Sequence, residues 1–295
     1  MTHGRILCVT STVPDLDAAL ADYQDVLGLA LVEEGRVDAA LAASWATPAS
    51  AGARTAVLQP RSGARSFIRL VEAPLPADFR PTTTFGWAAF ELTVQDVFGW
   101  PARLAGSGFE IVGPPKEIPG LPYFVAMQML GRGREMIYLN EVRQDTPTSD
   151  LPRAASPVDH AFIVILACPD RTVALAWYRD RLRLDIGGDY TIPYTMINKA
   201  FGLPDDHLTT ITMTQKGRMP IVEVDGYPPQ ATERPGDRDR LPAGNALVTL
   251  AVDDLGALDL DWTQRPTERD GALYGGRRTA CVLGPAGERL ELVEA

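Results

Sequence analysis

The chain has 295 residues, which fits two domains of ordinary size that each bury a core of their own. Its composition, 45% hydrophobic and 22% charged, is that of a globular protein, and no apolar run approaches the roughly 20 residues that span a bilayer. A formal net charge of −10 argues against nucleic acid or an anionic membrane as the main partner. Because the N-terminus has no signal-peptide pattern and the three cysteines form no CxxC pair, we expect a cytoplasmic protein whose thiols are small core residues.

A segment near the N-terminus of the chain is repeated in the second half. Asp15–Leu27 has the sequence DLDAALADYQDVL, and it returns 155 positions later as Asp170–Leu182, DRTVALAWYRDRL. A repeat at this distance indicates two similar halves. Each half contains a second, weaker repeat, since Phe85–Asp96 aligns with Ala243–Asp254. The chain therefore holds four units of roughly 60 to 75 residues, each comparable to a supersecondary motif.

Each unit begins with an apolar, β-branched run that predicts a strand, such as Ile6–Val13 or Ala161–Ala167. An Asp in N-cap position follows, and the apolar residues of Asp15–Leu27 then recur at helical spacing. Short strands broken by Gly and Pro complete each unit. In chain order the clearest of them are Phe67–Val71, Phe124–Leu130, Met136–Leu139, Thr209–Thr214, Ile221–Val224, Thr279–Leu283 and Leu290–Val293.

The stretch 143–156 is polar, contains proline and lacks apolar periodicity, which is typical of a linker. It divides the chain into an N-terminal domain of residues 1–142 and a C-terminal domain of residues 157–295. The order of strand, helix and three strands predicts α+β units whose sheets pair into curved half-barrels.

The repeated string D-x-x-x-A-x-x-x-Y-x-D-x-L, the four-unit organisation and the closing strand Glu288–Glu294 after a Gly turn resemble the vicinal oxygen chelate superfamily. That superfamily includes glyoxalase I, extradiol dioxygenases, fosfomycin-resistance proteins and bleomycin-binding proteins. The resemblance covers nearly the whole chain apart from the linker and the segment Asp189–His207. It implies an α+β fold of two tandem glyoxalase-like domains, each made of two paired βαβββ units that form a curved half-barrel.

In this family a divalent metal lies inside the cup of the half-barrel, held by residues on the first and last strands of the paired units. Carried over to the C-terminal half, these positions offer His160, Glu223 and Glu291 as metal ligands, while nothing suitable stands near Asn245. An imidazole and two carboxylates suit Mn, Fe, Ni, Co or Zn, whose identity the sequence leaves open. A cation would also offset the cost of burying two carboxylates close together. The alternative is that His160 is a strand-end histidine with surface hydrogen bonds and that both glutamates face water.

The N-terminal half lacks these groups and is predicted to hold no metal. Aligning Gly133 with Gly287 gives the counterpart of Glu291, and the 155-position repeat gives that of His160. Arg5 stands opposite His160, with Cys8 the nearest potential ligand, and Arg69 stands opposite Glu223. Trp87 stands opposite Asn245, and Ile137 stands opposite Glu291. Arg69 is open to three interpretations: it pairs with a carboxylate, it binds an anionic ligand, or it is exposed on its strand.

Several aromatic residues lie in segments that would surround the C-terminal cup. They can stack on a ring-bearing substrate or hydrogen-bond to it, or they can simply cover core edges. The predicted substrate-binding residues are Tyr190, Tyr194, Tyr227, Asn245 and Tyr274. Glu223 is the preferred catalytic residue, as a general base.

Two functions are compatible with these residues. The first is a metal-dependent enzyme that acts on a small oxygenated organic substrate through a metal-stabilised enediolate or enolate. Its type is isomerase, lyase or dioxygenase, the last being less favoured because a second histidine is missing near Asn245. The second is a non-catalytic protein that binds or sequesters a small molecule, as resistance proteins do. Neither nucleic acid nor a membrane is an expected partner, and the choice between monomer and homodimer is left open.

Overall fold

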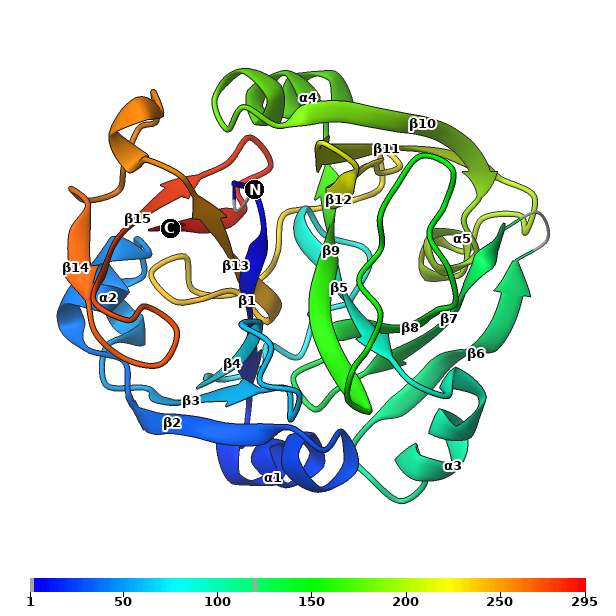
Figure 1. Cartoon of the computed structure of the whole chain (residues 1–295), viewed down its shortest axis with the longest axis horizontal. Coiled ribbons are helices and arrows are strands. Elements are labelled where there is room, and N and C mark those ends of the chain that lie inside the picture. The colour runs from blue at the N-terminus through cyan, green and yellow to red at the C-terminus, as the bar shows by residue number, and fades with distance from the viewer. Residues whose placement is uncertain (1–2, 119–120) are drawn as a thin grey trace.

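The structure is a computed structural model that describes residues 3–118 and 121–295. It contains the four predicted units in chain order, each with a first strand, a short helical segment and further strands (Figure 1). Every strand named from the sequence falls within an observed strand, except that the closing strand begins at Arg289 and not at Glu288. Within the described residues, no helix is both long and apolar enough to cross a membrane.

The first unit comprises β1 (Ile6–Val13), α1 (Leu16–Ala21), η1 (Asp22–Val26), β2 (Ala30–Arg36), α2 (Ala39–Ser44), η2 (Pro48–Ser50), β3 (Arg54–Gln59) and β4 (Phe67–Glu72). The second comprises β5 (Gly86–Val94), η3 (Val97–Gly99), α3 (Trp100–Leu104), β6 (Glu110–Ile118), β7 (Leu121–Leu130) and β8 (Met136–Val142). The third comprises β9 (Val158–Cys168), α4 (Arg171–Asp180), β10 (Asp185–Pro193), α5 (Thr195–Phe201), β11 (Leu208–Lys216) and β12 (Met219–Gly226). The fourth comprises β13 (Gly244–Val252), η4 (Leu255–Ala257), β14 (Thr267–Arg269), β15 (Arg277–Leu283) and β16 (Arg289–Glu294).

The two copies of the repeated helix begin in the same way. The side chain of Asp15 accepts a hydrogen bond from the backbone of Ala18 at 2.9 Å, and that of Asp170 accepts one from Val173 at 3.1 Å. Both aspartates have extended backbone angles, as helix N-caps do. The predicted N-cap role is therefore confirmed in both halves.

The strands form two curved sheets of eight strands each. One has the order β14-β15-β16-β13-β1-β4-β3-β2, and the other has the order β10-β11-β12-β9-β5-β8-β7-β6. Each sheet is a pair of units that curls into a half-barrel, which confirms the predicted α+β class (Figure 1).

The units that share a sheet differ from those predicted to pair. β1 pairs with β13 and β5 pairs with β9, both antiparallel, so the first unit joins the fourth and the second joins the third. Units two and three are consecutive in the chain, and consecutive elements are usually neighbours in space. Repeated sequences identify similar units but contain nothing that says which of them exchange strands. The domain boundaries at 1–142 and 157–295 stay a prediction, and each sheet takes one unit from either side of them.

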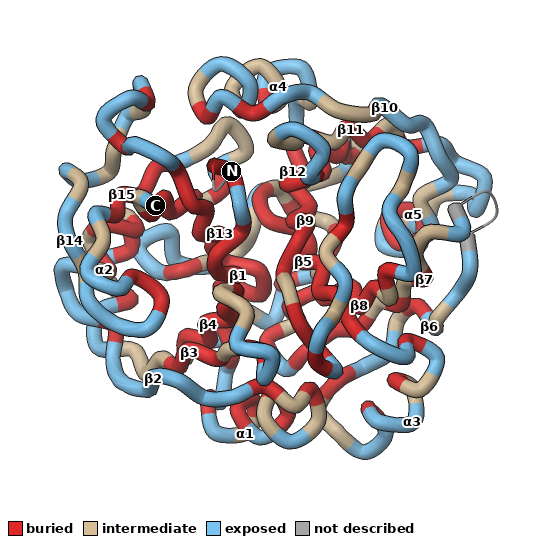
Figure 2. The backbone as a smooth tube through the Cα atoms, viewed as in Figure 1, coloured by how far each residue is buried: buried red, intermediate tan, exposed pale blue. Residues whose placement is uncertain are grey.

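Side chains alternate between the two faces of each sheet. On β12, Val222 and Val224 belong to the large apolar core between the sheets, whereas Glu223 and Asp225 point to the concave face. Figure 2 shows that the central strands are buried while the outer strands β2 and β10 are exposed. We call the concave face of the sheet with β1, β4, β13 and β16 the first cup, and that of the sheet with β5, β8, β9 and β12 the second cup.

All three cysteines are buried and unpaired, in agreement with the expected core role of these thiols.

The tyrosine of the repeated motif links neighbouring units of the same half. Tyr23 donates a hydrogen bond to Oε1 of Glu135 at 2.9 Å, and Tyr178 donates one to Oε1 of Glu288 at 2.8 Å. Burial raises the pKa of each glutamate to about 7. These bonds join units one and two and units three and four, so every unit is bound to one neighbour by strands and to another by a buried hydrogen bond.

Replacing Tyr178 with Phe is expected to lower the free energy of unfolding by about 1–2 kcal/mol, because Glu288 loses a buried donor. Chemical denaturation of the Tyr178→Phe variant measures the change. Tyr190→Phe is the matched control, since the Tyr190 side chain is exposed. Equal stability of the two variants would contradict the linking role of Tyr178.

Candidate functional site

The first cup is filled by a closed polar network around Glu291 on β16. Oε1 of Glu291 accepts hydrogen bonds from Trp45 Nε1 and Tyr274 Oη, both at 2.9 Å. Oε2 accepts from Arg69 Nη2 at 2.9 Å and from Thr249 Oγ1 at 2.8 Å. Glu291 is 1% exposed and Arg69 is 2% exposed. Both carboxylate oxygens are therefore fully used by protein donors.

Arg69, on β4, is the cation of this network. A second guanidinium nitrogen of Arg69 donates to Tyr274 Oη at 2.9 Å, and the guanidinium lies 4.8 Å from the ring centroid of Trp45. Burial opposes ionisation of Glu291, but the positive charge of Arg69 and the surrounding donors lower the pKa of Glu291 below its ordinary value. Of the interpretations left open for Arg69, pairing with a carboxylate is confirmed.

The second cup contains three buried acids. Glu91 on β5 accepts a hydrogen bond from Asn140 Nδ2 at 2.8 Å, and Glu223 on β12 accepts one from Tyr194 Oη at 3.1 Å. Asp225, two residues beyond Glu223, is fully buried, and neither of its carboxylate oxygens has a hydrogen-bond donor within the described part of the chain.

The acids of the second cup hold protons more tightly than carboxyl groups in water. Burial raises the pKa of Glu91 and Asp225 well above the ordinary range, and the nearby charge of Glu223 raises both further. Burial raises the pKa of Glu223 to about 7, against the opposing effect of the hydrogen bond from Tyr194. Glu223 is thus poised to gain or lose a proton near neutral pH.

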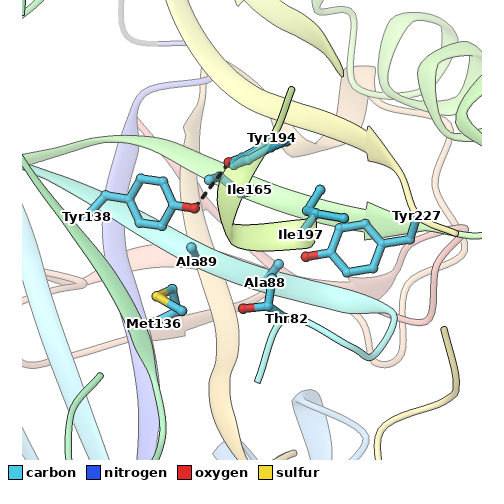
Figure 3. A pocket seen from close by; sticks show the side chains of 9 residues that line it. All are labelled: Thr82, Ala88, Ala89, Met136, Tyr138, Ile165, Tyr194, Ile197 and Tyr227. Atoms are coloured by element: carbon cyan, nitrogen blue, oxygen red, sulfur yellow. Dashed lines mark hydrogen bonds between the residues drawn. The ribbon is translucent and has the colours of Figure 1, made fainter. Parts of the chain in front are cut away.

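A small, closely packed pocket is lined by Tyr194, the donor to Glu223, while the three acids are not among its described lining residues. Figure 3 shows Tyr138 and Tyr194 with their hydroxyl groups directed toward each other, 3.2 Å apart, and Tyr227 on the opposite side. Ile197, from α5, lies over the pocket, so this helix covers the second cup.

The predicted metal ligands do not come together. Glu223 and Glu291 lie in different sheets, because the units pair across the two halves. Ile165 is the β9 residue that pairs with Glu223, and His160 precedes it by five residues, or about 17 Å of extended strand. Nδ1 of His160 instead lies 3.2 Å from Asp159 Oδ1. Across residues 3–118 and 121–295, no three His, Cys, Asp or Glu side chains are grouped so as to hold a metal ion.

The predicted substrate-binding residues are divided in the same way. Tyr194 and Tyr227 line the pocket of the second cup. Tyr190 is exposed on β10, and Tyr274 belongs to the closed network of the first cup. The amide of Asn245 accepts from the backbone nitrogen of Met136 at 2.8 Å and donates to its carbonyl oxygen at 3.0 Å, so it bonds the two sheets together.

The sequence alignment also missed Tyr138 as the counterpart of Glu291. Glu135 and Glu288 accept equivalent tyrosine hydrogen bonds, which places Tyr138, and not Ile137, opposite Glu291. The error arose at the preceding turn, where the left-handed position of Gly287, at φ 75°, is taken in the other copy by Arg134, at φ 61°. Aligning the two glutamates rather than the two glycines would have found Tyr138.

Glu91 and Asp225 were missed as well. A signal for Asp225 was present, because a strand residue two positions from Glu223 shares its face. For Glu91 there was none, since its role depends on β5 lying beside β9.

Arg69→Ala is expected to lower the free energy of unfolding by about 3–5 kcal/mol, because it leaves the buried charge of Glu291 uncompensated. The double variant Arg69→Met with Glu291→Leu should lose less than the two single variants added together. Denaturation curves of the wild type, Arg69→Met, Glu291→Leu and the double variant complete this cycle. Additive losses would show that the pair is not coupled.

Stability is expected to fall as the pH rises from about 4.5 to about 7. The native carboxyls of Glu135, Glu223 and Glu288 have their pKa raised from 4.5 to about 7. Between these two pH values the native state therefore binds more protons than the unfolded state. The stabilisation that proton binding gives is complete below pH 4.5, and it is lost as the pH rises through about 7. Denaturation midpoints between pH 4.5 and 8 measure the slope. Glu223→Gln should make it shallower, and a slope of opposite sign in the wild type would refute the assignment.

Comparison with known proteins agrees with the fold and the repeats. Residues 5–128 match the model of the Glyoxalase/Bleomycin resistance protein/Dioxygenase superfamily. The crystal structure of glyoxalase I from Zea mays superposes with a TM-score of 0.62 at 18% identity, covering 98% of this chain and 92% of that one. A putative dioxygenase from Bacillus subtilis gives a TM-score of 0.61 at 10% identity, covering 99% of this chain and 86% of that one. No curated protein matches the chain. The family match thus covers residues 5–128, and the whole chain shares the fold of glyoxalase I, with four units in a single polypeptide.

Proposed function

We propose that the protein is an enzyme that acts on a small oxygenated organic molecule held in the second cup, with Glu223 as the residue that transfers a proton. The observation that carries this proposal is a buried carboxyl group with a pKa of about 7 whose hydrogen-bond donor, Tyr194, lines a pocket. Perturbed carboxyl groups beside a pocket are typical of sites that carry out acid–base chemistry.

The reaction that fits these groups is removal of a proton from a carbon next to a carbonyl. The Glu223 carboxylate takes the proton, and the electron pair of the C–H bond moves toward the carbonyl oxygen to form an enolate. Tyr138 and Tyr194 supply hydroxyl groups at the pocket, and a hydroxyl donor stabilises the charge that develops on that oxygen. Return of the proton to a different carbon gives an isomerase, and loss of a neighbouring group from the enolate gives a lyase.

The divalent metal implied by the family does not fit the residues predicted to bind it. Neither His160 nor Glu291 reaches the second cup, and both oxygens of Glu291 are occupied by protein donors. The proposed steps therefore use only the protein's own groups.

The pocket limits the size of the substrate. In this structure the pocket does not admit even a molecule the size of water. A substrate of a few heavy atoms therefore requires the side chains over the pocket to move.

The test is hydrogen–deuterium exchange at the α-carbon of small enolisable aldehydes and ketones in D₂O, followed by proton NMR. The wild type should catalyse exchange with at least one of them, with a rate that rises with pH through about 7 as Glu223 ionises. Glu223→Gln should reduce the rate by about 10²–10⁴-fold.

Glu233→Gln is the control for this experiment, because Glu233 is an exposed acid outside the second cup. Exchange that survives in Glu223→Gln would remove Glu223 from the mechanism. Binding without exchange, in both wild type and variant, would instead favour the alternative of a sequestering protein.

A further inference from the structure

We propose that an open pocket beside the connection between β4 and β5 binds a small organic anion, whose carboxylate is held by Arg80 and Arg134 and whose apolar body lies against the pocket wall. This site goes beyond the proposed function, since it shares no lining residue with the pocket of the second cup. It has about 260 Å³ of space, far more than the roughly 10–15 Å³ that one water molecule needs.

The wall of this pocket is apolar and already in place. It is formed by Leu75, Pro76, Phe79 and Pro81. The backbone nitrogen of Phe79 donates to the carbonyl of Pro76 at 3.1 Å, and the two prolines restrict the backbone further. The Phe79 ring packs against the start of β13, where a Cβ at Gly244 would lie 3.1 Å from it. Preformed apolar walls with a few polar groups are typical of small-molecule sites.

Two arginines provide the polar side of the pocket. Arg134, in the turn between β7 and β8, pairs with Glu110 at 2.6 Å. Arg80 is exposed, and its side chain forms neither an ion pair nor a hydrogen bond with any residue that the structure describes. Asp78 belongs to the same segment but is not among the described lining residues. The guanidinium of Arg80 is therefore available to a ligand.

A third guanidinium adds to the positive charge at this place. That of Arg234 lies 5.5 Å from the ring centroid of Phe79. In the described part of the chain it donates to one hydroxyl group and to backbone carbonyls, and to no acid. Three arginines with a single acidic partner form a locally positive region in a chain of net charge −10, and such a region attracts anions.

The backbone of Arg134 is the second observation that points to a ligand. Its φ of 61° is in the left-handed region, and its counterpart in the other half of the chain is Gly287, at φ 75°. A residue with a side chain pays a steric cost in this conformation that glycine avoids. Strained residues of this kind cluster at functional sites. An arginine at a position that favours glycine indicates that its side chain has a role beyond the turn.

A carboxylate with an apolar body matches both sides of the pocket. The planar guanidinium of arginine donates two parallel hydrogen bonds to a carboxylate, and these charge-assisted bonds are stronger than neutral ones. The apolar body removes the wall from water, which an inorganic anion does not do.

The test is calorimetric titration with three probes: benzoate, benzyl alcohol and inorganic phosphate. Benzoate should bind at least about tenfold more tightly than benzyl alcohol, because the alcohol has the same ring but forms no charge-assisted hydrogen bond. It should also bind more tightly than phosphate, which leaves the apolar wall in contact with water.

Two variants locate the site. Arg80→Gln and Arg134→Gly should each weaken benzoate binding by about tenfold and leave the affinity for benzyl alcohol unchanged. Arg134→Gly should not lower the free energy of unfolding, because glycine adopts the left-handed backbone without strain and the exposed pair with Glu110 contributes little. A loss of binding in this variant therefore cannot come from unfolding.

Arg103→Gln is the matched control. Arg103 is exposed and pairs with Asp96 at 3.0 Å, as Arg134 pairs with Glu110, but it lies outside the pocket. Its replacement should leave benzoate binding unchanged.

Four outcomes would overturn the proposal. They are benzoate binding no tighter than that of benzyl alcohol, equal affinity for benzoate and phosphate, no binding of any probe, and full benzoate affinity in both Arg80→Gln and Arg134→Gly. Exchange at the α-carbon is measured separately with Glu223→Gln, so this proposal and the proposed function can fail independently.

Discussion

The antiparallel pairing of β5 with β9, and its counterpart between β1 and β13, determines which buried polar groups share each cup. These hydrogen bonds join units from different halves of the chain, so each cup is lined by residues far apart in sequence. Glu91 and Glu223 meet because β5 and β12 lie on either side of β9. Glu223 and Glu291 are separated for the same reason.

The two cups have the same fold but differ in how their buried charges are compensated. In the first cup an arginine and a glutamate neutralise each other, and an indole, a phenol and a hydroxyl group occupy the remaining acceptor positions. Such a network is satisfied and rigid, and it leaves no acceptor for a ligand. In the second cup a glutamate replaces the arginine, and the acids there remain only partly paired. Burial raises the pKa of these acids and so favours their protonated forms.

The two cups also differ in the side chains that cover them. The first cup is a core whose ion pair stabilises the molecule, and its Trp45 comes from the segment that follows α2. In the second cup the corresponding insertion, α5, contributes Met196 and Ile197, which belong to an apolar cluster and to the lining of the small pocket. The first cup is therefore covered by an indole that bonds to a carboxylate, whereas α5 contributes two apolar side chains that form no hydrogen bond.

The sequence by itself determined the units, because hydrophobic alternation, helix caps and repeated motifs are local properties. Ile6–Val13 was predicted as a strand with its observed bounds, and Asp15 and Asp170 as N-caps. It also identified Glu223, Tyr194 and Tyr227, which lie in one cup, and the superfamily. Only the tertiary structure decided which units share a sheet, because backbone hydrogen bonds between strands are the same whichever copies provide them. That choice moved Glu291 and Tyr274 into a closed network, left His160 at a strand end, and brought Glu91 and Asp225 to Glu223.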